Sequence, residues 1–150
     1  MKRLIAIILA LVCAIGLASC SNTEQEDVTT YYFSGEHECF TISNGSIILS
    51  NKGQEFYGGE LTITQPGIFE NVTSYSAIFY TLRNGERDPF QSTTITGLTG
   101  NSAPNGEKLG NASSTGFIIS NLEQGLWFEL KTTDVHGTEN VYQIELTLTP

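Results

Sequence analysis

The sequence from Val28 onward predicts an all-β fold, an antiparallel β-sandwich, on three observations. No segment shows a helical period, and Thr, Ile, Val, Tyr and Phe recur in short runs. Gly, Asn, Ser and Pro break these runs at regular intervals. About eight short strands at such spacing favour immunoglobulin-like layers, although the Cys–Trp–Cys pattern of true immunoglobulin domains is missing. A small β-barrel is the alternative architecture.

The first predicted hairpin joins residues 39–42 to residues 46–49. Ser43-Asn44-Gly45 lies between these two apolar runs. Asn-Gly favours a tight turn because both residues tolerate positive φ. Before this hairpin, the chain from Val28 has β composition without a marked strand boundary.

The next strand is predicted over residues 60–64, where apolar and polar residues alternate. This alternation places Leu61 and Ile63 together on one face. The preceding segment, residues 56–59, ends in Gly-Gly, which indicates a bulge or bend at the entry to the strand. Gln-Pro-Gly at residues 65–67 predicts a turn after it.

Residues 74–82 predict a strand that is covered on both faces, because apolar side chains occupy both phases of its alternation. Asn84-Gly85 then reverses the chain. Residues 90–98 are predicted to form a strand that pairs with residues 74–82. This return strand should begin after Pro89, which has no N–H to donate to a neighbouring strand.

The last predicted hairpin has a defined inside and outside. Residues 126–131 and 142–148 alternate, and a turn at residues 134–137 separates them. The side chains expected to face the core are Leu126, Phe128, Leu130, Tyr142, Ile144, Leu146 and Leu148. Residues 99–116 are poor in apolar side chains and predict a long loop, with a further strand over residues 117–122.

The first twenty residues predict a secretory signal. Lys2 and Arg3 precede an uncharged apolar run over residues 4–17, and small residues follow. The run is shorter than the roughly 20 residues that span a bilayer, which disfavours a permanent transmembrane helix. Leu17-Ala18-Ser19-Cys20 at its end resembles the lipobox of bacterial lipoproteins. An ordinary signal peptide with a cysteine near its cleavage site is the alternative.

The resemblance to bacterial lipoproteins covers residues 1–20 only. It implies cleavage before Cys20, diacylglyceryl modification of its sulfur, and anchoring to the outer face of the bacterial cell membrane, or to an outer membrane where the cell has one. Two acyl chains on one residue provide a stable anchor. The expected organisation of the chain is therefore a signal peptide over residues 1–19, an anchor and flexible tether over residues 20–27, and one β domain over residues 28–150.

The charge balance argues against partners that are strongly anionic. Without Lys2 and Arg3 the 7 basic residues fall to 5, and the formal charge falls from −9 to −11. Nucleic acids and anionic headgroups need a basic surface, so neither is expected to bind. Membrane contact should therefore depend on the lipid at Cys20, and the acidic surface is expected to be mainly solvated.

Candidates for metal binding or catalysis are few. His37 and Cys39 would share an outward face if they lie on one strand, and could supply part of a zinc or copper site. A plain half-exposed strand is the simpler interpretation, and no further pair of ligands is evident. Glu86 and Asp88 lack the spacing of an EF-hand calcium loop. His136 lies in the predicted turn at residues 134–137, so no base for a nucleophile stands out and no cofactor is expected.

The candidate contact surface is the polar face of the last hairpin. Trp127, Glu129 and Lys131 lie opposite the predicted core phase, and an exposed Trp on a rigid strand is typical of a binding anchor. Alternatively, Trp127 covers a neighbouring segment. The sequence thus favours a non-catalytic module that binds an unknown protein or glycan. A small cell-surface enzyme, or an enzyme accessory that acts on envelope polysaccharide, is the alternative function.

Overall fold

The computed structural model describes residues 27–99, 102–114 and 122–150. These residues form ten antiparallel strands and two short 3-10 helices, with no α-helix among them. The elements are β1 (Val28–His37), β2 (Phe40–Ser50), β3 (Gly53–Tyr57), β4 (Glu60–Ile63), η1 (Pro66–Phe69), β5 (Val72–Arg83), β6 (Glu86–Thr96), β7 (Asn105–Lys108), β8 (Asn111–Ser114), η2 (Leu122–Gln124), β9 (Leu126–Asp134) and β10 (Glu139–Thr149). The predicted all-β, antiparallel class is confirmed.

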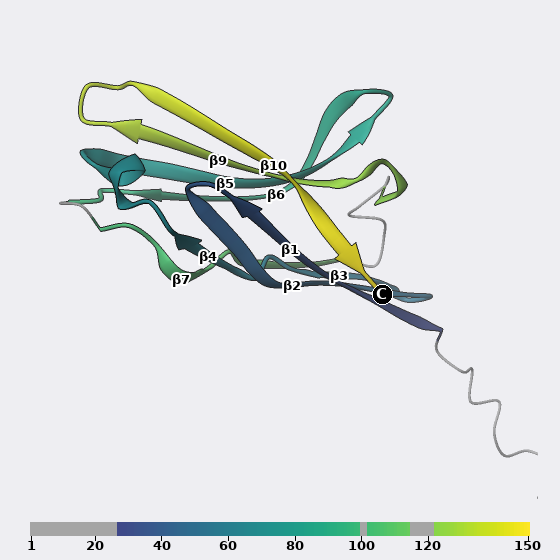
Figure 1. The fold of residues 1–150 in the computed structure, drawn as a ribbon. Helices are drawn as coiled ribbons and strands as arrows, with labels where there is room; N and C mark the ends of the chain where they lie inside the picture. Colours follow the sequence, from purple (N-terminus) through teal and green to yellow (C-terminus); the bar gives the residue numbers. More distant parts are fainter. Residues whose placement is uncertain (1–26, 100–101, 115–121) are drawn as a thin grey trace, which may run out of the picture.

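The strands form two layers that share one strand (Figure 1). One layer has the order β6-β5-β9-β10, and the other contains β1, β2, β3, β4, β7 and β8. β10 belongs to both layers, because its first part pairs with β9 up to Leu146 and its last part pairs with β1 from Thr147. The layers are therefore joined along one side by continuous backbone pairing.

The opposite side of the two layers is nearly closed as well. The hydroxyl of Thr93 on β6 donates a hydrogen bond to the carbonyl of Leu109, between β7 and β8, at 3.2 Å. This contact joins the free edge of one layer to the other layer through a side chain. The domain is thus a nearly closed, barrel-like sheet, with features of both predicted architectures.

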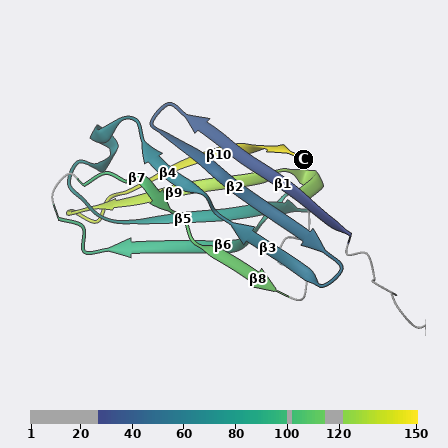
Figure 2. The same ribbon diagram turned by 90° about the horizontal axis from the view of Figure 1, so that it is seen from below.

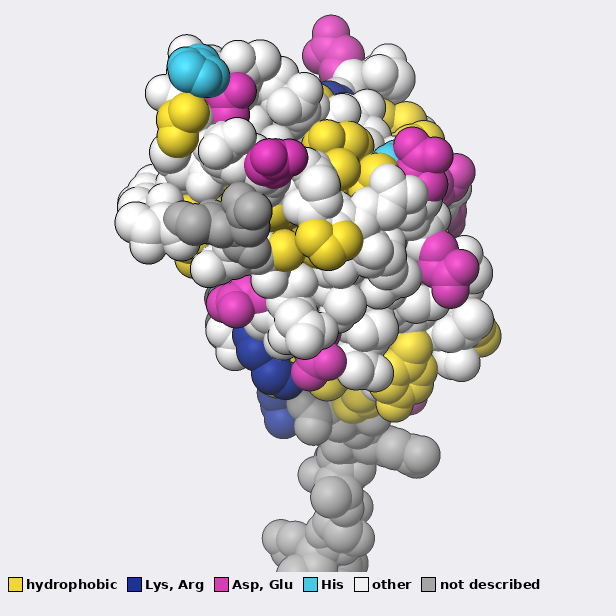
Figure 3. Space-filling model, turned by 60° about the vertical axis from the view of Figure 1, so that its left-hand side comes forward, with side chains coloured by type: hydrophobic (Ala, Val, Ile, Leu, Met, Phe, Trp, Pro, Cys, Tyr) yellow, Lys and Arg dark blue, Asp and Glu magenta, His cyan; other side chains and the backbone are white. Residues whose placement is uncertain are grey.

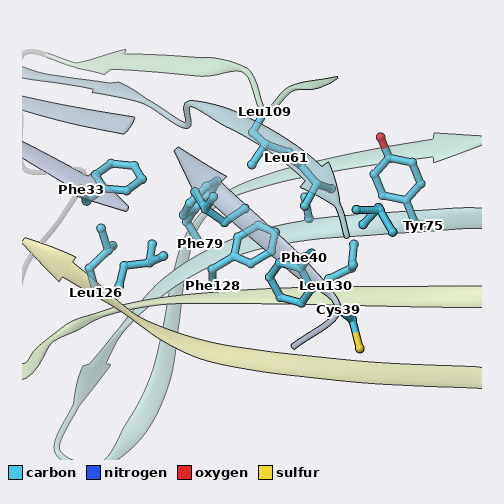
Figure 4. Packing of buried hydrophobic residues seen from close by; sticks show 14 of the residues in the cluster. Phe33, Cys39, Phe40, Leu61, Tyr75, Phe79, Leu109, Leu126, Phe128 and Leu130 are labelled. Atoms are coloured by element: carbon cyan, nitrogen blue, oxygen red, sulfur yellow. The ribbon is translucent and has the colours of Figure 1, made fainter. Parts of the chain in front are cut away.

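An aromatic core fills the space between the layers (Figure 4). The rings of Phe79 and Phe128 lie 5.0 Å apart, and that of Phe40 lies 5.6 Å from Phe128. Leu61 on β4 and Leu130 on β9 are fully buried beside them. The inward faces predicted for residues 60–64 and for the last hairpin are confirmed.

The first predicted hairpin turn is wrong. Ser43-Asn44-Gly45 lies within β2, which runs without reversal from Phe40 to Ser50. Its first part pairs with β4 and its second part with β3. A shift in the pairing with β1 places an extra residue here, and Asn44 has a φ of 58°. The Asn-Gly signal therefore marks a β-bulge that bends β2, since a bulge needs the same positive φ as a turn.

Two other boundaries differ from the prediction. Within the predicted loop over residues 99–116, β7 and β8 pair with β4 and β3. β6 begins before Pro89, which an edge strand tolerates beside the register shift opposite Phe79. The strand predicted over residues 117–122 falls mainly outside the described residues, and Leu122 begins η2.

The Asn84-Gly85 turn is confirmed. Arg83 pairs with Glu86, and both turn residues have positive φ, 54° and 81°. Gly85→Val should therefore lower the free energy of unfolding by about 1 kcal/mol or more, because a β-branched residue resists this conformation. Urea unfolding checks the value; Gly85→Asn is the control and should cost less, because Asn tolerates positive φ.

Candidate functional site

His37 and Cys39 do not share the face of one strand. β1 ends at His37, and Glu38 and Cys39 form a tight turn into β2, where His37 pairs with Phe40. The imidazole stacks on the Phe40 ring at 4.9 Å and its Nδ1 accepts the Cys39 backbone N–H at 3.2 Å. The Cys39 side chain is buried, only 4% exposed. The prediction that both side chains point outward is therefore wrong, because the turn rotates Cys39 into the core.

The thiol of Cys39 is expected to be protected in the folded protein. Burial, and then the charge of Glu38, raise the pKa of the Cys39 thiol, which donates to the Gln65 side-chain oxygen at 3.6 Å. Maleimide labelling should thus be slow in the native state and complete after unfolding, since the thiolate is the reactive form. Fast native labelling, or a Cys39-linked dimer isolated from cells, would contradict the buried position.

The described part of the chain contains no cluster of three His, Cys, Asp or Glu side chains that could hold a metal ion. Asp88 forms an ion pair with Arg83 at 2.7 Å, at the β5–β6 turn. His136 is exposed in the β9–β10 turn, where its backbone N–H donates to the Asp134 carboxylate at 2.8 Å. These groups form local turn contacts and do not converge on one point.

Trp127 lies on the predicted outer face of β9 but is not a freely exposed ring. It is half-buried, and stacks on Tyr80 of β5 with ring centres 6.2 Å apart. Its indole nitrogen is buried and has no hydrogen-bond partner among the described residues. Tyr80 itself is 3% exposed. Trp127 therefore covers the outer face of its layer, and its role as a contact residue stays a prediction.

Glu129 and Lys131, the other predicted contact residues, are both engaged in ion pairs. The Glu129 carboxylate is buried, accepts from Arg87 at 2.8 Å, and accepts from the Gln143 amide at 2.6 Å. Lys131 pairs with Glu139 at 2.6 Å. The structure thus brings Trp127 and Glu129 into one closed cluster, with Arg87 also over the Tyr80 ring at 4.4 Å.

A second surface, not predicted from the sequence, lies on the outer face of the other layer. Figure 2 shows its strands β1, β2, β3 and β8 side by side. Tyr32 pairs with Ser46, Ser46 with Tyr57, and Tyr57 with Asn111, so these four residues form one row across the strands. We call them the tyrosine row. Tyr32 is 58% and Tyr57 40% exposed, so a large part of each side chain is open to solvent.

The tyrosine row borders a polar hollow of about 490 Å³. This hollow is lined by Asn44, Ser46, Tyr57, Gly59, Glu60, Lys108, Gly110 and Asn111. A second hollow of about 440 Å³ lies over the same strands, nearer the β2–β3 turn, and includes Ile48 and Glu55. Such a volume with polar walls and one exposed ring suits a small ligand or part of a longer one.

The charges in the polar hollow are held by neighbouring groups. Lys108 donates to Glu60 at 2.9 Å and Asn44 donates to it at 3.2 Å, and both bonds lower the pKa of the Glu60 carboxyl. The Tyr57 hydroxyl donates to Glu55 at 2.8 Å, which raises the pKa of the phenol. At neutral pH the hollow therefore presents a paired carboxylate and a neutral phenol.

The sequence carried part of the signal for this surface. Alternation around the buried Phe33 and Phe56 places Tyr32 and Tyr57 on the outer face. The alternation does not give the register of the strands, and the sequence predicts Ser46 on a separate strand after a turn. The continuous β2 is what brings the two tyrosines into one row.

Comparisons with protein-family models, with curated proteins and with solved structures find no match for this chain. Among the described residues, no helix is both long and apolar enough to cross a bilayer.

Proposed function

We propose that the chain is a lipid-anchored, extracytoplasmic binding module without catalytic activity. The observation that carries the proposal is the polar hollow beside the exposed Tyr57 ring, formed by paired strands of one sheet. A rigid sheet face with an aromatic anchor and surrounding polar groups is typical of small binding modules. We also propose that the two layers around the aromatic core are immunoglobulin-like in arrangement.

The position of the proposed anchor fits this function. The domain begins at Val28, which pairs with Ser50 at the far end of β2 from the bulge at Asn44. A tether over residues 20–27 would reach at most about 28 Å when fully extended. The tether would thus join the domain near the β2–β3 turn, and the polar hollow would lie farther along the strands from this attachment point.

The surface charge also supports an anchor that depends on lipid alone. Figure 3 shows acidic side chains scattered over the face in view, with few basic ones. Such a surface has no electrostatic attraction to anionic headgroups. Membrane attachment should therefore require the acyl chains.

Cys20→Ser should release the protein from the membrane fraction or leave its signal peptide uncleaved, because no sulfur remains to carry the lipid. Membrane fractionation and intact-mass analysis of the wild type and variant measure this. The control is Cys39→Ser, which should stay in the membrane fraction. A mature wild-type chain with an unmodified Cys20 would contradict the proposed anchor.

Binding can be tested with the acylated protein in detergent micelles, against a panel of peptides, oligosaccharides, nucleotides and small metabolites. We expect saturable binding that Tyr57→Ala weakens and Trp127→Ala does not. Loss with Trp127→Ala alone would move the site to the outer face of β9. Turnover of any glycoside, ester or peptide would overturn the non-catalytic assignment, and no binding across the panel would overturn the proposal.

A further inference from the structure

We propose that the tyrosine row binds a neutral glycan chain, laid across strands β1, β2, β3 and β8. This inference rests on the proposed function and names the ligand class of the same site. It depends on three features of the described residues: the spacing of the two exposed rings, the polar groups between and beside them, and the balance of charge.

The backbone positions of the two tyrosines have the spacing that an extended sugar chain needs. Tyr32 and Tyr57 lie on either side of Ser46, with one strand between them. Neighbouring strands are about 4.8 Å apart, so the Cα atoms of the two tyrosines lie about 10 Å apart. That distance is comparable to the repeat between alternate sugars of an extended glycan. Each ring can therefore stack on the C–H face of one sugar, with a third sugar over Ser46.

The side chains around the rings match the hydroxyl groups of sugars. Ser46 and Asn111 offer both donors and acceptors, and they lie in the same row as the rings. Asn44 and Lys108 flank the Glu60 carboxylate, which can accept further bonds from hydroxyl hydrogens because a carboxylate has about four acceptor positions. A sugar presents donors and acceptors in alternation, and such a mixed lining pairs with both.

The charge of the two hollows favours an uncharged ligand. Their lining contains two carboxylates, of Glu55 and Glu60, and two ammonium groups, of Lys52 and Lys108. Lys108 already pairs with Glu60. An anionic glycan would be repelled by the Glu55 carboxylate and by the acidic surface of the protein. A neutral glycan would meet no such repulsion. Binding across the sheet also fits the lining of the two hollows, which comes from neighbouring strands of one layer.

The test uses the acylated protein in micelles on an array of neutral oligosaccharides (β-glucans, α-glucans, mannans and galactans) and anionic uronates of similar length. The best-bound sugar is then titrated by calorimetry. We expect a neutral chain of several sugars to bind, and Tyr32→Ala and Tyr57→Ala each to weaken it at least about tenfold, as for a binding anchor. Tyr57→Phe keeps the ring and should retain most of the affinity.

Val141→Ala is the matched control, since Val141 is 52% exposed on the other layer and should leave the affinity unchanged. Binding of uronates alone would overturn the assignment of a neutral glycan. Binding that neither tyrosine variant alters would overturn the assignment of the site to the tyrosine row. Failure of all glycans while a peptide or metabolite still depends on Tyr57 would overturn this inference and leave the proposed function intact. Failure of every class would overturn both.

Discussion

Gly45→Ala should lower the free energy of unfolding by about 3 kcal/mol, near the upper end for overpacking of a core. A Cβ atom at this position would overlap the Phe33 ring. Phe33 cannot move aside freely, because it stacks on Phe56 at 5.6 Å and contacts Phe79 at 5.8 Å. The bulge at Asn44 fixes the approach of the two strands from the other side. Urea unfolding followed by tryptophan fluorescence measures the loss.

Two further variants separate this contact from a general cost of replacing glycine. Gly67→Ala is the control, because a Cβ there has no atom within 4 Å, and its effect should stay within about 0.5 kcal/mol. In a double-mutant cycle with Phe33→Leu, the smaller side chain should recover about 1 kcal/mol of the Gly45→Ala loss. Independent, additive effects would show that the Phe33 ring does not occupy this space.

Arg87→Met should lower the free energy of unfolding by about 2 kcal/mol, because it leaves a buried carboxylate without its cation. The Glu129 side chain is 5% exposed, and Arg87 is its ion-pair partner at 2.8 Å. The same substitution removes the guanidinium from the Tyr80 ring, which adds a smaller cation–π loss. Thermal and urea unfolding at neutral pH both report the change.

The neighbouring hairpin pair provides a matched control. Arg83 and Asp88 form an ion pair of similar length, 2.7 Å, but their side chains are 58% and 36% exposed. Arg83→Met should therefore cost less than about 1 kcal/mol. Adding Glu129→Gln to Arg87→Met should restore part of the lost stability, since no charge then remains buried. Equal losses for the two arginine variants would mean that Glu129 is solvated.

The sequence predicts the parts of this fold that depend on local alternation. Burial of Leu126, Phe128 and Leu130 on one phase of β9 follows from the two-residue period, and the Asn84-Gly85 turn follows from the tolerance of both residues for positive φ. Both signals lie within a few neighbouring residues. They need no knowledge of which strand lies beside which.

Features that depend on partners far along the chain were not predictable in this way. Asn44-Gly45 has the same composition as a hairpin turn, and only the pairing of β2 with both β3 and β4 shows a bulge instead. All four residues of β7 are exposed, so its sequence has no alternation of buried and exposed positions that would predict a strand. β7 is a strand because it pairs with β4. The tyrosine row depends in the same way on the register of four strands, β1, β2, β3 and β8.

The strand shared by both layers has a consequence for the order of folding. Tyr32 and Thr149 contact each other although they are 117 positions apart in the sequence, and β10 joins the two layers through this pairing. Contacts between distant parts of a chain form slowly, because closing the long intervening loop costs conformational entropy. If the chain is exported as proposed, it cannot close its sheet until β10 has emerged across the membrane. Hairpins such as β5–β6 and β1–β2 could pair before that point, whereas the two layers could join only after it.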